Sequence, residues 1–209
     1  MENTKPFERR AYDFEIRAEI NEETSVGVVT GRPIVYDSRT DLGYFDEIIE
    51  RGALDKTDLR DVRFLVNHDL SRIPLARSRN NNANSTMQMT VDDQGMAIRV
   101  NLDVENNSEA RNLYSAIERG DISGMSFMFS IDGERWEGLD TEHPTRHITA
   151  ISNVIEVSAV TFPAYEDTEI SVRNKEALES AKTALESAQR SLESDLNLAK
   201  AKALAKIII

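Results

Sequence analysis

The sequence contains no cysteine among its 209 residues. Disulfides, thiol nucleophiles and the usual cysteine-ligated structural zinc sites are therefore excluded, and nothing in the chain requires an oxidising compartment. The chain also lacks an apolar segment of membrane-spanning length, and its first residues run directly into charged ones without the apolar stretch of a signal peptide. We therefore expect a cytoplasmic protein with no membrane partner.

The chain has fewer basic than acidic residues. The chain has 25 Lys and Arg against 37 Asp and Glu, which gives a formal net charge of -12. Such a surface repels a phosphate backbone, and no run of Lys and Arg marks a local exception, so we expect no nucleic-acid partner. What the chain does have, 40% hydrophobic and 30% charged residues, is the composition of an ordinary soluble globular protein with one substantial core.

Most of the chain before residue 165 shows the period-two alternation of β-strands. A bend is expected at Gly31 and Pro33, because proline cannot donate to a sheet ladder. The last predicted strand is apolar on both faces, which indicates the centre of a sheet or barrel. The sequence therefore predicts a mostly β fold over residues 1–173, a closed or nearly closed antiparallel β-barrel with helical insertions. Strands are predicted over 12–20, 26–36, 62–67, 87–91, 96–104, 123–131 and 147–162, and a helix over 108–120.

The composition changes near the C-terminus. From Asn174 onward there is no glycine, proline or aromatic residue, and Leu and Ala recur with the heptad spacing of a short coiled-coil seam. We predict a helical tail over residues 174–209. Its role stays open between a surface helix docked on the barrel, an oligomerisation arm and a targeting tail. The heptad positions are Leu178, Ala181, Leu185, Ala188 and Leu192.

Three otherwise apolar segments each contain one reactive or ionisable side chain, namely His68, Ser126 and Glu156. Strand parity predicts that His68 shares a face with Phe64 and Val66, and a buried His68 or Glu156 needs a hydrogen-bonded partner. The simplest arrangement lets the two meet. A serine hydroxyl becomes a nucleophile when an imidazole takes its proton and a third group orients that imidazole. Each residue also has an ordinary structural interpretation, as a strand serine, a hydrogen-bonded histidine or an ion-pair glutamate.

Five short motifs follow one another along residues 10–173. They are Gly52-Ala53-Leu54, Val66-Asn67-His68-Asp69, Asp93-Gln94-Gly95-Met96, Gly124-Met125-Ser126-Phe127, and the run from Glu156 to Tyr165. In this order they resemble the prohead protease family of tailed bacteriophages. That family is similar to herpesvirus assemblin, a β-barrel serine protease surrounded by helices. The resemblance implies a serine endopeptidase with His68 as general base and Ser126 as nucleophile.

The resemblance also implies where the protein acts and on what. The expected location is the procapsid in the cytoplasm of the infected bacterial host. The expected partners are the major capsid protein with its scaffold segments, and further copies of the chain itself, which it would process by autoproteolysis. No cofactor and no metal are expected. The tail from residue 174 is then a candidate for packaging or scaffolding contacts.

The third member of the site stays open. Herpesvirus assemblins use a second histidine, and both His143 and His147 lie between Ser126 and Glu156. Glu156 is favoured because it lies in the strand expected to be buried, whereas His143 precedes Pro144 in a loop-forming segment. The two histidines also have the spacing of a metal pair, but only on a helix that Pro144 would have to open.

Two positions depart from the family's pattern, because Ala76 and Met128 stand where we expect glycine. Side chains there would narrow the cleft or alter an oxyanion-stabilising loop. A second function therefore stays open, a catalytically silent capsid-assembly scaffold or binding module with a coiled tail. The oxyanion donors stay open among amides near Gly124 or after Pro163 and a water held by Arg146 or Arg173.

Overall fold

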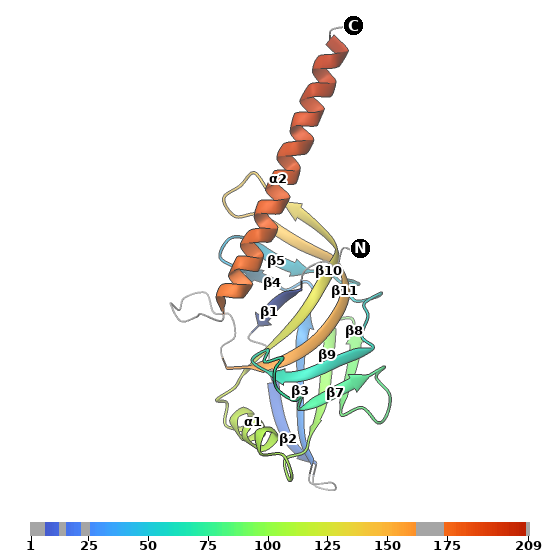
Figure 1. The fold of residues 1–209 in the computed structure, drawn as a ribbon, viewed down its shortest axis with the longest axis vertical. Coiled ribbons are helices and arrows are strands. Elements are labelled where there is room, and N and C mark those ends of the chain that lie inside the picture. Colours follow the sequence, from blue (N-terminus) through green and yellow to red (C-terminus); the bar gives the residue numbers. More distant parts are fainter. Residues whose placement is uncertain (1–6, 13–15, 22–25, 162–173, 208–209) are drawn as a thin grey trace.

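A computed structural model describes residues 7–12, 16–21, 26–161 and 174–207 (Figure 1). In this part of the chain two sheets and two helices are formed. The first sheet contains β1 (Glu8–Tyr12), β4 (Arg39–Asp41), β5 (Asp46–Ile49), β6 (Asp61–Val66), β7 (Ala76–Arg79), β10 (Gly124–Glu137) and β11 (Thr145–Val160). The second contains β2 (Ile16–Asn21), β3 (Val26–Val35), β8 (Met87–Asp92) and β9 (Gly95–Leu102). The helices are α1 (Ser108–Glu118) and α2 (Asn174–Ile207).

The long strand β11 is the centre of the first sheet, as its apolar faces predict. One edge pairs antiparallel with β10 along nearly the whole strand. The other edge pairs in parallel with β5 near residue 145 and with β6 near residue 156. The outer strands are β1 beside β10, β4 beside β5 and β7 beside β6. Because β11 has neighbours on both sides near Glu156, its backbone is paired along both edges there.

The mostly β fold is confirmed, but a closed barrel is not found among the described strands. The hydrogen-bonded order of the first sheet ends at β1, β4 and β7, and that of the second ends at β2 and β8. One apolar cluster joins both sheets and α1, with Val29 and Met96 from the second sheet and Phe64, Phe127 and Val157 from the first. Alternation predicts which side chains face a core, but it does not say which strands meet at the edges.

The alternating segment 12–20 is not one strand. β1 ends at Tyr12 in the first sheet, and β2 begins at Ile16 in the second. The two strands belong to different sheets, and the period of the side chains carries no sign of that change. The consequence for the site is direct, because β1 pairs with β10 and places Ala11 opposite Ser126.

Several local predictions are confirmed. The β8–β9 hairpin turns at Gly95, whose φ of +131° favours glycine, and the register of β3 shifts between Gly31 and Ile34. The side chain of Asn107 caps α1, accepting hydrogen bonds from the backbone amides of the first turn. The short strands β4, β5 and β7 were not predicted, because three or four residues show too little alternation.

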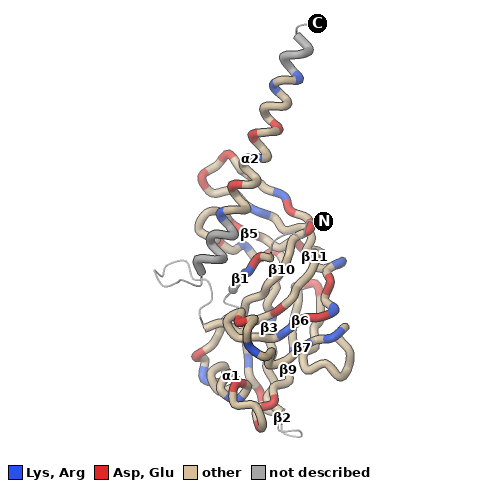
Figure 2. Tube along the Cα trace, in the orientation of Figure 1, with Lys and Arg blue, Asp and Glu red and all other residues tan. Residues whose placement is uncertain are grey.

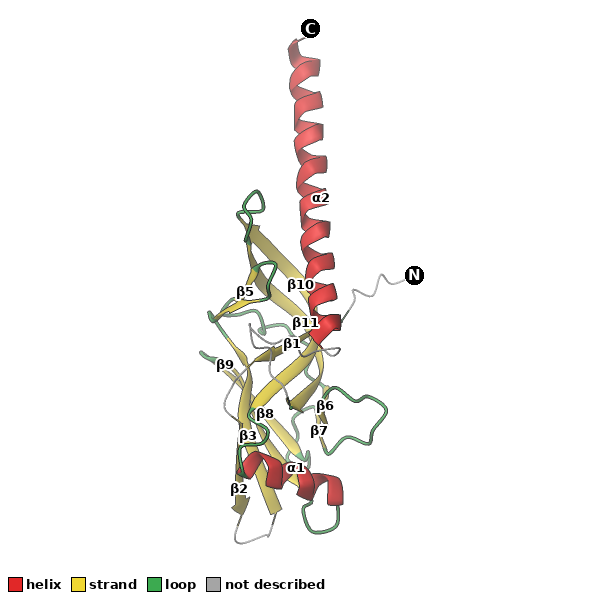
Figure 3. Cartoon of the chain, turned by 90° about the vertical axis from the view of Figure 1, so that its left-hand side faces the viewer, coloured by secondary structure: helices red, strands yellow, loops and turns green. Residues whose placement is uncertain are grey.

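The predicted helical tail is present as α2, which carries both acidic and basic residues (Figure 2). It begins beside β1 and extends beyond the two sheets (Figure 3). The side chains described in it, residues 182–202, are largely exposed, including Leu192 and Leu196. A helix docked along its length on the sheets is therefore not found in this stretch. Among the described residues no helix is both long and apolar enough to cross a membrane.

This arrangement predicts that the sheets fold without the tail. A chain ending at Arg173 should unfold with a free energy within about 1 kcal/mol of the full chain, because residues 182–202 bury little apolar surface. Chemical denaturation of the two chains measures the difference. Failure of the shortened chain to give a cooperative transition would contradict the prediction.

Candidate active site

Glu156 is a carboxylate with no exposed surface, in the middle of β11. Each of its oxygens has a partner: the Nδ1 atom of His68 lies 2.5 Å from Oε1, and the hydroxyl of Ser158 donates to Oε2 at 2.6 Å. An enclosed carboxylate without such partners would cost several kcal/mol. The His68 ring and the Ser158 hydroxyl are therefore part of what allows Glu156 to be buried.

His68 reaches Glu156 because the chain turns sharply after β6. Asn67 and His68 both adopt left-handed conformations, with φ of +53° and +58°, which is uncommon outside glycine and best tolerated by asparagine. Contacts with β11 hold this turn. The backbone amide of Asn67 donates to the Ala159 carbonyl at 2.9 Å, and that of His68 donates to the Ser158 hydroxyl at 3.0 Å.

The face predicted for His68 was wrong. Phe64 and Val66 face the apolar core, whereas His68 meets Glu156, which lies on the opposite face of the sheet. Strand parity fails because β6 ends at Val66 and the two left-handed residues redirect the chain. The predicted meeting of His68 with Glu156 is nevertheless present.

Ser126 lies on β10, one strand away from this pair. It is directly opposite Ser158 on β11 and has no exposed surface. Antiparallel partners have Cα atoms about 4.5–5.5 Å apart, so Ser126 and Ser158 are close neighbours. In this structure the Ser126 hydroxyl donates to the Arg10 carbonyl of β1 at 2.7 Å. No hydrogen bond joins Ser126 to His68, and both residues lie in the described part of the chain.

The structure does not place the other two histidines beside His68. His147 lies nine residues before Glu156 on β11, roughly 30 Å away at about 3.3 Å per residue, and its Nδ1 atom is 3.0 Å from a Glu50 oxygen. The Nε2 atom of His143 is 3.2 Å from an Asp46 oxygen. Of the three residues considered for the third position, only Glu156 contacts the His68 ring.

The predicted alternative of a metal pair made by His143 and His147 is not found. His143 is instead grouped with Asp41 and Asp46, with potential ligand atoms all within 4.8 Å of one another. Asp41 and His143 are exposed, and exposed acidic groups of this kind are common on protein surfaces. The grouping lies beside β4 and β5 and not beside Glu156.

Arg146, considered above as a holder of water, belongs instead to a buried cluster of ion pairs. Its guanidinium donates to Glu8, Glu47 and Glu134, and Arg10 donates to Glu8 and Glu47. Burial raises the pKa of Glu8, but Arg10 and Arg146 lower it to below its usual value overall. The cluster ties β1 to β5, β10 and β11. Arg173 and the loop after Pro163 lie outside the described residues.

Ala76 and Met128, the two residues that stand where the family resemblance predicts glycine, have different surroundings. Ala76 begins β7 opposite Phe64 and faces the apolar core. Met128 is opposite Glu156 and two residues along β10 from Ser126, so its buried side chain lies on the face of the sheet that carries the site. Only Met128 is therefore placed to fill space beside the candidate catalytic residues.

Sequence reasoning gave no role to Ser158 or Asn67. The position of Ser158 two residues after Glu156 puts both on one face of β11, which was visible in the alternation. The position of Asn67 before His68 was also visible, and asparagine tolerates the left-handed conformation. Each signal was present, but neither is specific without knowledge that β6 pairs with β11.

A histidine held by a buried carboxylate, with a buried serine one strand away, is the set of side chains that serine-type hydrolases use. The chain belongs to the caudovirus prohead serine protease family, whose model matches residues 13–183. It is thus a bacteriophage protease of capsid maturation. No curated protein matches the chain. A solved structure that is similar is the capsid assembly protease gp21 of bacteriophage T4, at 9% identity and a TM-score of 0.34, over 73% of this chain and 98% of that one.

The contacts of Ser158 predict a measurable loss of stability on its removal. Ser158→Ala leaves one buried Glu156 oxygen without a donor and the His68 amide without its acceptor, so the free energy of unfolding should fall by about 1–3 kcal/mol. Chemical denaturation measures this change. Ser152→Ala is the matched control, because the Ser152 hydroxyl contacts only the uncharged Ser130. Equal losses in the two variants would contradict the prediction.

Proposed function

We propose that this chain is a serine endopeptidase in which Ser126 is the nucleophile, His68 the general base and Glu156 the group that orients the imidazole. One observation carries the proposal: the Nδ1 atom of His68 lies 2.5 Å from a carboxylate that has no exposed surface. A proton held on Nδ1 by Glu156 leaves Nε2 free to accept another. Glu156 then stabilises the imidazolium that forms when His68 takes the serine proton.

The reaction requires Ser126 to change its hydrogen bond. Its hydroxyl donates to the Arg10 carbonyl of β1. In the proposed reaction the hydroxyl rotates to another staggered rotamer that faces β11, because His68 contacts Glu156 and Ser158 of that strand. His68 takes the hydroxyl proton as Oγ attacks the peptide carbonyl, and returns it to the leaving amine. Water then hydrolyses the acyl-enzyme by the same route.

Ser126 must also become accessible. It has no exposed surface, and β1 is the strand beside it at the edge of the sheet. We propose that substrate binding is accompanied by displacement of β1 from β10, which releases the hydroxyl from Arg10. The buried ion pairs of Arg10 oppose this displacement, and their strength sets how easily the site opens.

The proposed substrates are the major capsid protein with its scaffold segments, cleaved inside the procapsid in the cytoplasm of the infected host, and the chain itself. Family membership supports this assignment. The exposed helix α2 would serve packaging or scaffolding contacts, and cleavage before it would release the mature protease.

A second function, a catalytically silent assembly module, is favoured by the burial of Ser126 and by its hydrogen bond to Arg10 instead of His68. Met128 also favours this second function, because its side chain lies on the same face of the sheet and fills space beside the site.

Labelling with a fluorophosphonate probe separates the two functions. The wild-type chain should label at Ser126 and shorten on standing. Ser126→Ala should fold but neither label nor shorten, because the acyl acceptor is gone. Ser130→Ala is the control, since Ser130 lies on the same strand with its hydroxyl bonded to Asn153. Absence of labelling in folded wild-type protein would favour the silent module.

The role of Glu156 predicts a second result. Glu156→Gln keeps the size of the side chain but loses the charge that orients His68, so kcat should fall by as much as about 10⁴-fold. His147→Gln should leave kcat within about threefold, since His147 lies far along β11 from His68. Circular dichroism must first establish that both variants fold. A large loss from His147→Gln with little from Glu156→Gln would reverse the assignment.

A further inference from the structure

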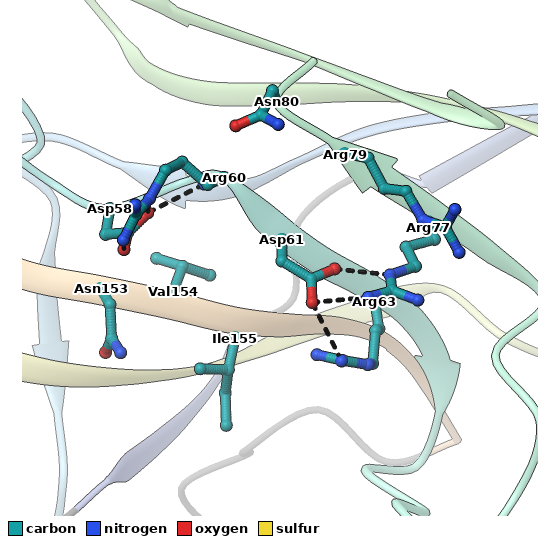
Figure 4. A pocket seen from close by; sticks show the side chains of 10 residues that line it. All are labelled: Asp58, Arg60, Asp61, Arg63, Arg77, Arg79, Asn80, Asn153, Val154 and Ile155. Atoms are coloured by element: carbon teal, nitrogen blue, oxygen red, sulfur yellow. Dashed lines mark hydrogen bonds and ion pairs between the residues drawn. The ribbon is translucent and has the colours of Figure 1, made fainter. Parts of the chain in front are cut away.

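An open cavity of about 600 Å³ lies between β6, β7 and the part of β11 next to Glu156. Its lining includes Ile155, the residue before Glu156. Charged side chains dominate its wall (Figure 4). They are Arg60, Arg63, Arg77 and Arg79 with Asp58 and Asp61. Four positive and two negative groups leave a formal charge of +2, in a chain whose net charge is -12.

The arginines continue the face of the sheet that carries the candidate site. Across the sheet, Met128 is opposite Glu156, Glu156 is opposite Arg63, and Arg63 is opposite Arg77. Residues opposite one another project to the same face of a sheet. Arg63 is therefore one strand from Glu156 and Arg77 is two. The intervening β6 residues Val62 and Phe64 face the core instead.

The cavity has more hydrogen-bond donors than its own carboxylates use. Arg77 donates to both oxygens of Asp61, and Arg63 donates to one of them. Arg77, with Arg63 and Arg79, lowers the pKa of Asp61, which is therefore ionised near neutral pH. A guanidinium carries five N–H donors, so Arg63 and Arg77 have donors to spare.

Arg79 has the most unused hydrogen-bond donors of the arginines in the cavity. It is exposed, and within the described chain its guanidinium makes no hydrogen bond or ion pair. Figure 4 shows it beside Arg77, with Asp61 between Arg77 and Arg63. A carboxylate matches the planar donors of arginine in a bidentate contact.

We propose that this cavity binds an aspartate or glutamate side chain of the polypeptide that the site cleaves. The inference rests on the proposed function. Strands lie about 4.8 Å apart, and Arg63 and Arg77 are two and three strands from Ser126. Since an extended chain rises about 3.3 Å per residue, an acidic side chain over either arginine lies about three to five residues from the bond at Ser126. A peptide fits better than a nucleic acid, because one carboxylate needs only the local arginines, whereas a phosphate backbone would extend over the acidic surface of the rest of the chain.

Cleavage profiling tests the inference. The full-length chain is incubated with a tryptic peptide library from a bacterial lysate, whose amines have been blocked, and mass spectrometry reads the new N-termini. Asp and Glu should be enriched about three to five residues from the cut bond. Arg79→Glu should remove that enrichment and lower kcat/KM on acidic peptides by about three- to tenfold. Arg119→Gln is the control, because Arg119 pairs with Asp121 beyond α1.

A binding measurement keeps the inference separate from catalysis. ¹⁵N-labelled Ser126→Ala protein is titrated with acetyl-Glu-Glu-amide or acetyl-Gln-Gln-amide, while NMR follows the arginine Nε–H signals. The acidic probe should shift the signals of Arg63, Arg77 and Arg79, and the amide probe should not. If the wild type cleaves nothing but these shifts occur, the proposed function fails and the acid-binding cavity stands. Equal responses to both probes, or an acidic preference that survives in Arg79→Glu, would overturn the inference.

Discussion

A carboxylate that is shut off from water must be given hydrogen-bond donors by the fold itself, and Glu156 imposes that requirement on the centre of β11. The requirement is met from two directions. Ser158 donates from the same strand, and His68 arrives from the end of β6. The parallel pairing of β6 with β11 and the left-handed turn at Asn67 are both needed to bring the ring there. The geometry of the candidate site is thus a consequence of burying one charge.

A second set of buried groups, the ion pairs of Arg10, holds β1, the edge strand beside Ser126. Arg10 comes from β1, and its side chain donates to Glu47 of β5 while its carbonyl accepts the Ser126 hydroxyl. Arg10 therefore both anchors the edge strand through its side chain and accepts the hydrogen bond of the proposed nucleophile through its carbonyl. The stability of β1 in the sheet is thus coupled to the accessibility of Ser126, because displacement of β1 would release the Ser126 hydroxyl.

Much of the fold could be predicted from the sequence, because long alternating segments report which face of a strand is buried. β3, the β8–β9 hairpin, α1, β11 and the helical tail followed from that signal together with turn and cap residues. The closed barrel that we predicted is not found among the described strands, because strand pairing at sheet edges depends on contacts between distant segments. The division of residues 12–20 between β1 and β2 could not be predicted either, because it also depends on which distant strands each part pairs with.

The candidate site was predictable in its residue types but not in its geometry. The polar residues His68 and Glu156 stood out in apolar segments, and burial required that they find partners. The face of His68 was predicted wrongly, because nothing in the period of β6 signals two left-handed residues after Val66. The arginine cavity was also missed, since Arg63 and Arg77 come together only through the pairing of β6 with β7.

The proposed mechanism requires that Glu156 holds a proton on Nδ1 of His68 and leaves Nε2 free. Long-range ¹⁵N–¹H correlation NMR of the histidine rings reports this tautomer directly. The chain has three histidines, so loss of one set of signals in His68→Gln assigns the ring. In its neutral form the His68 ring should carry its proton on Nδ1 alone, and Glu156→Gln should abolish this preference. A neutral His68 ring protonated on Nε2 in the wild-type chain would contradict the orienting role of Glu156.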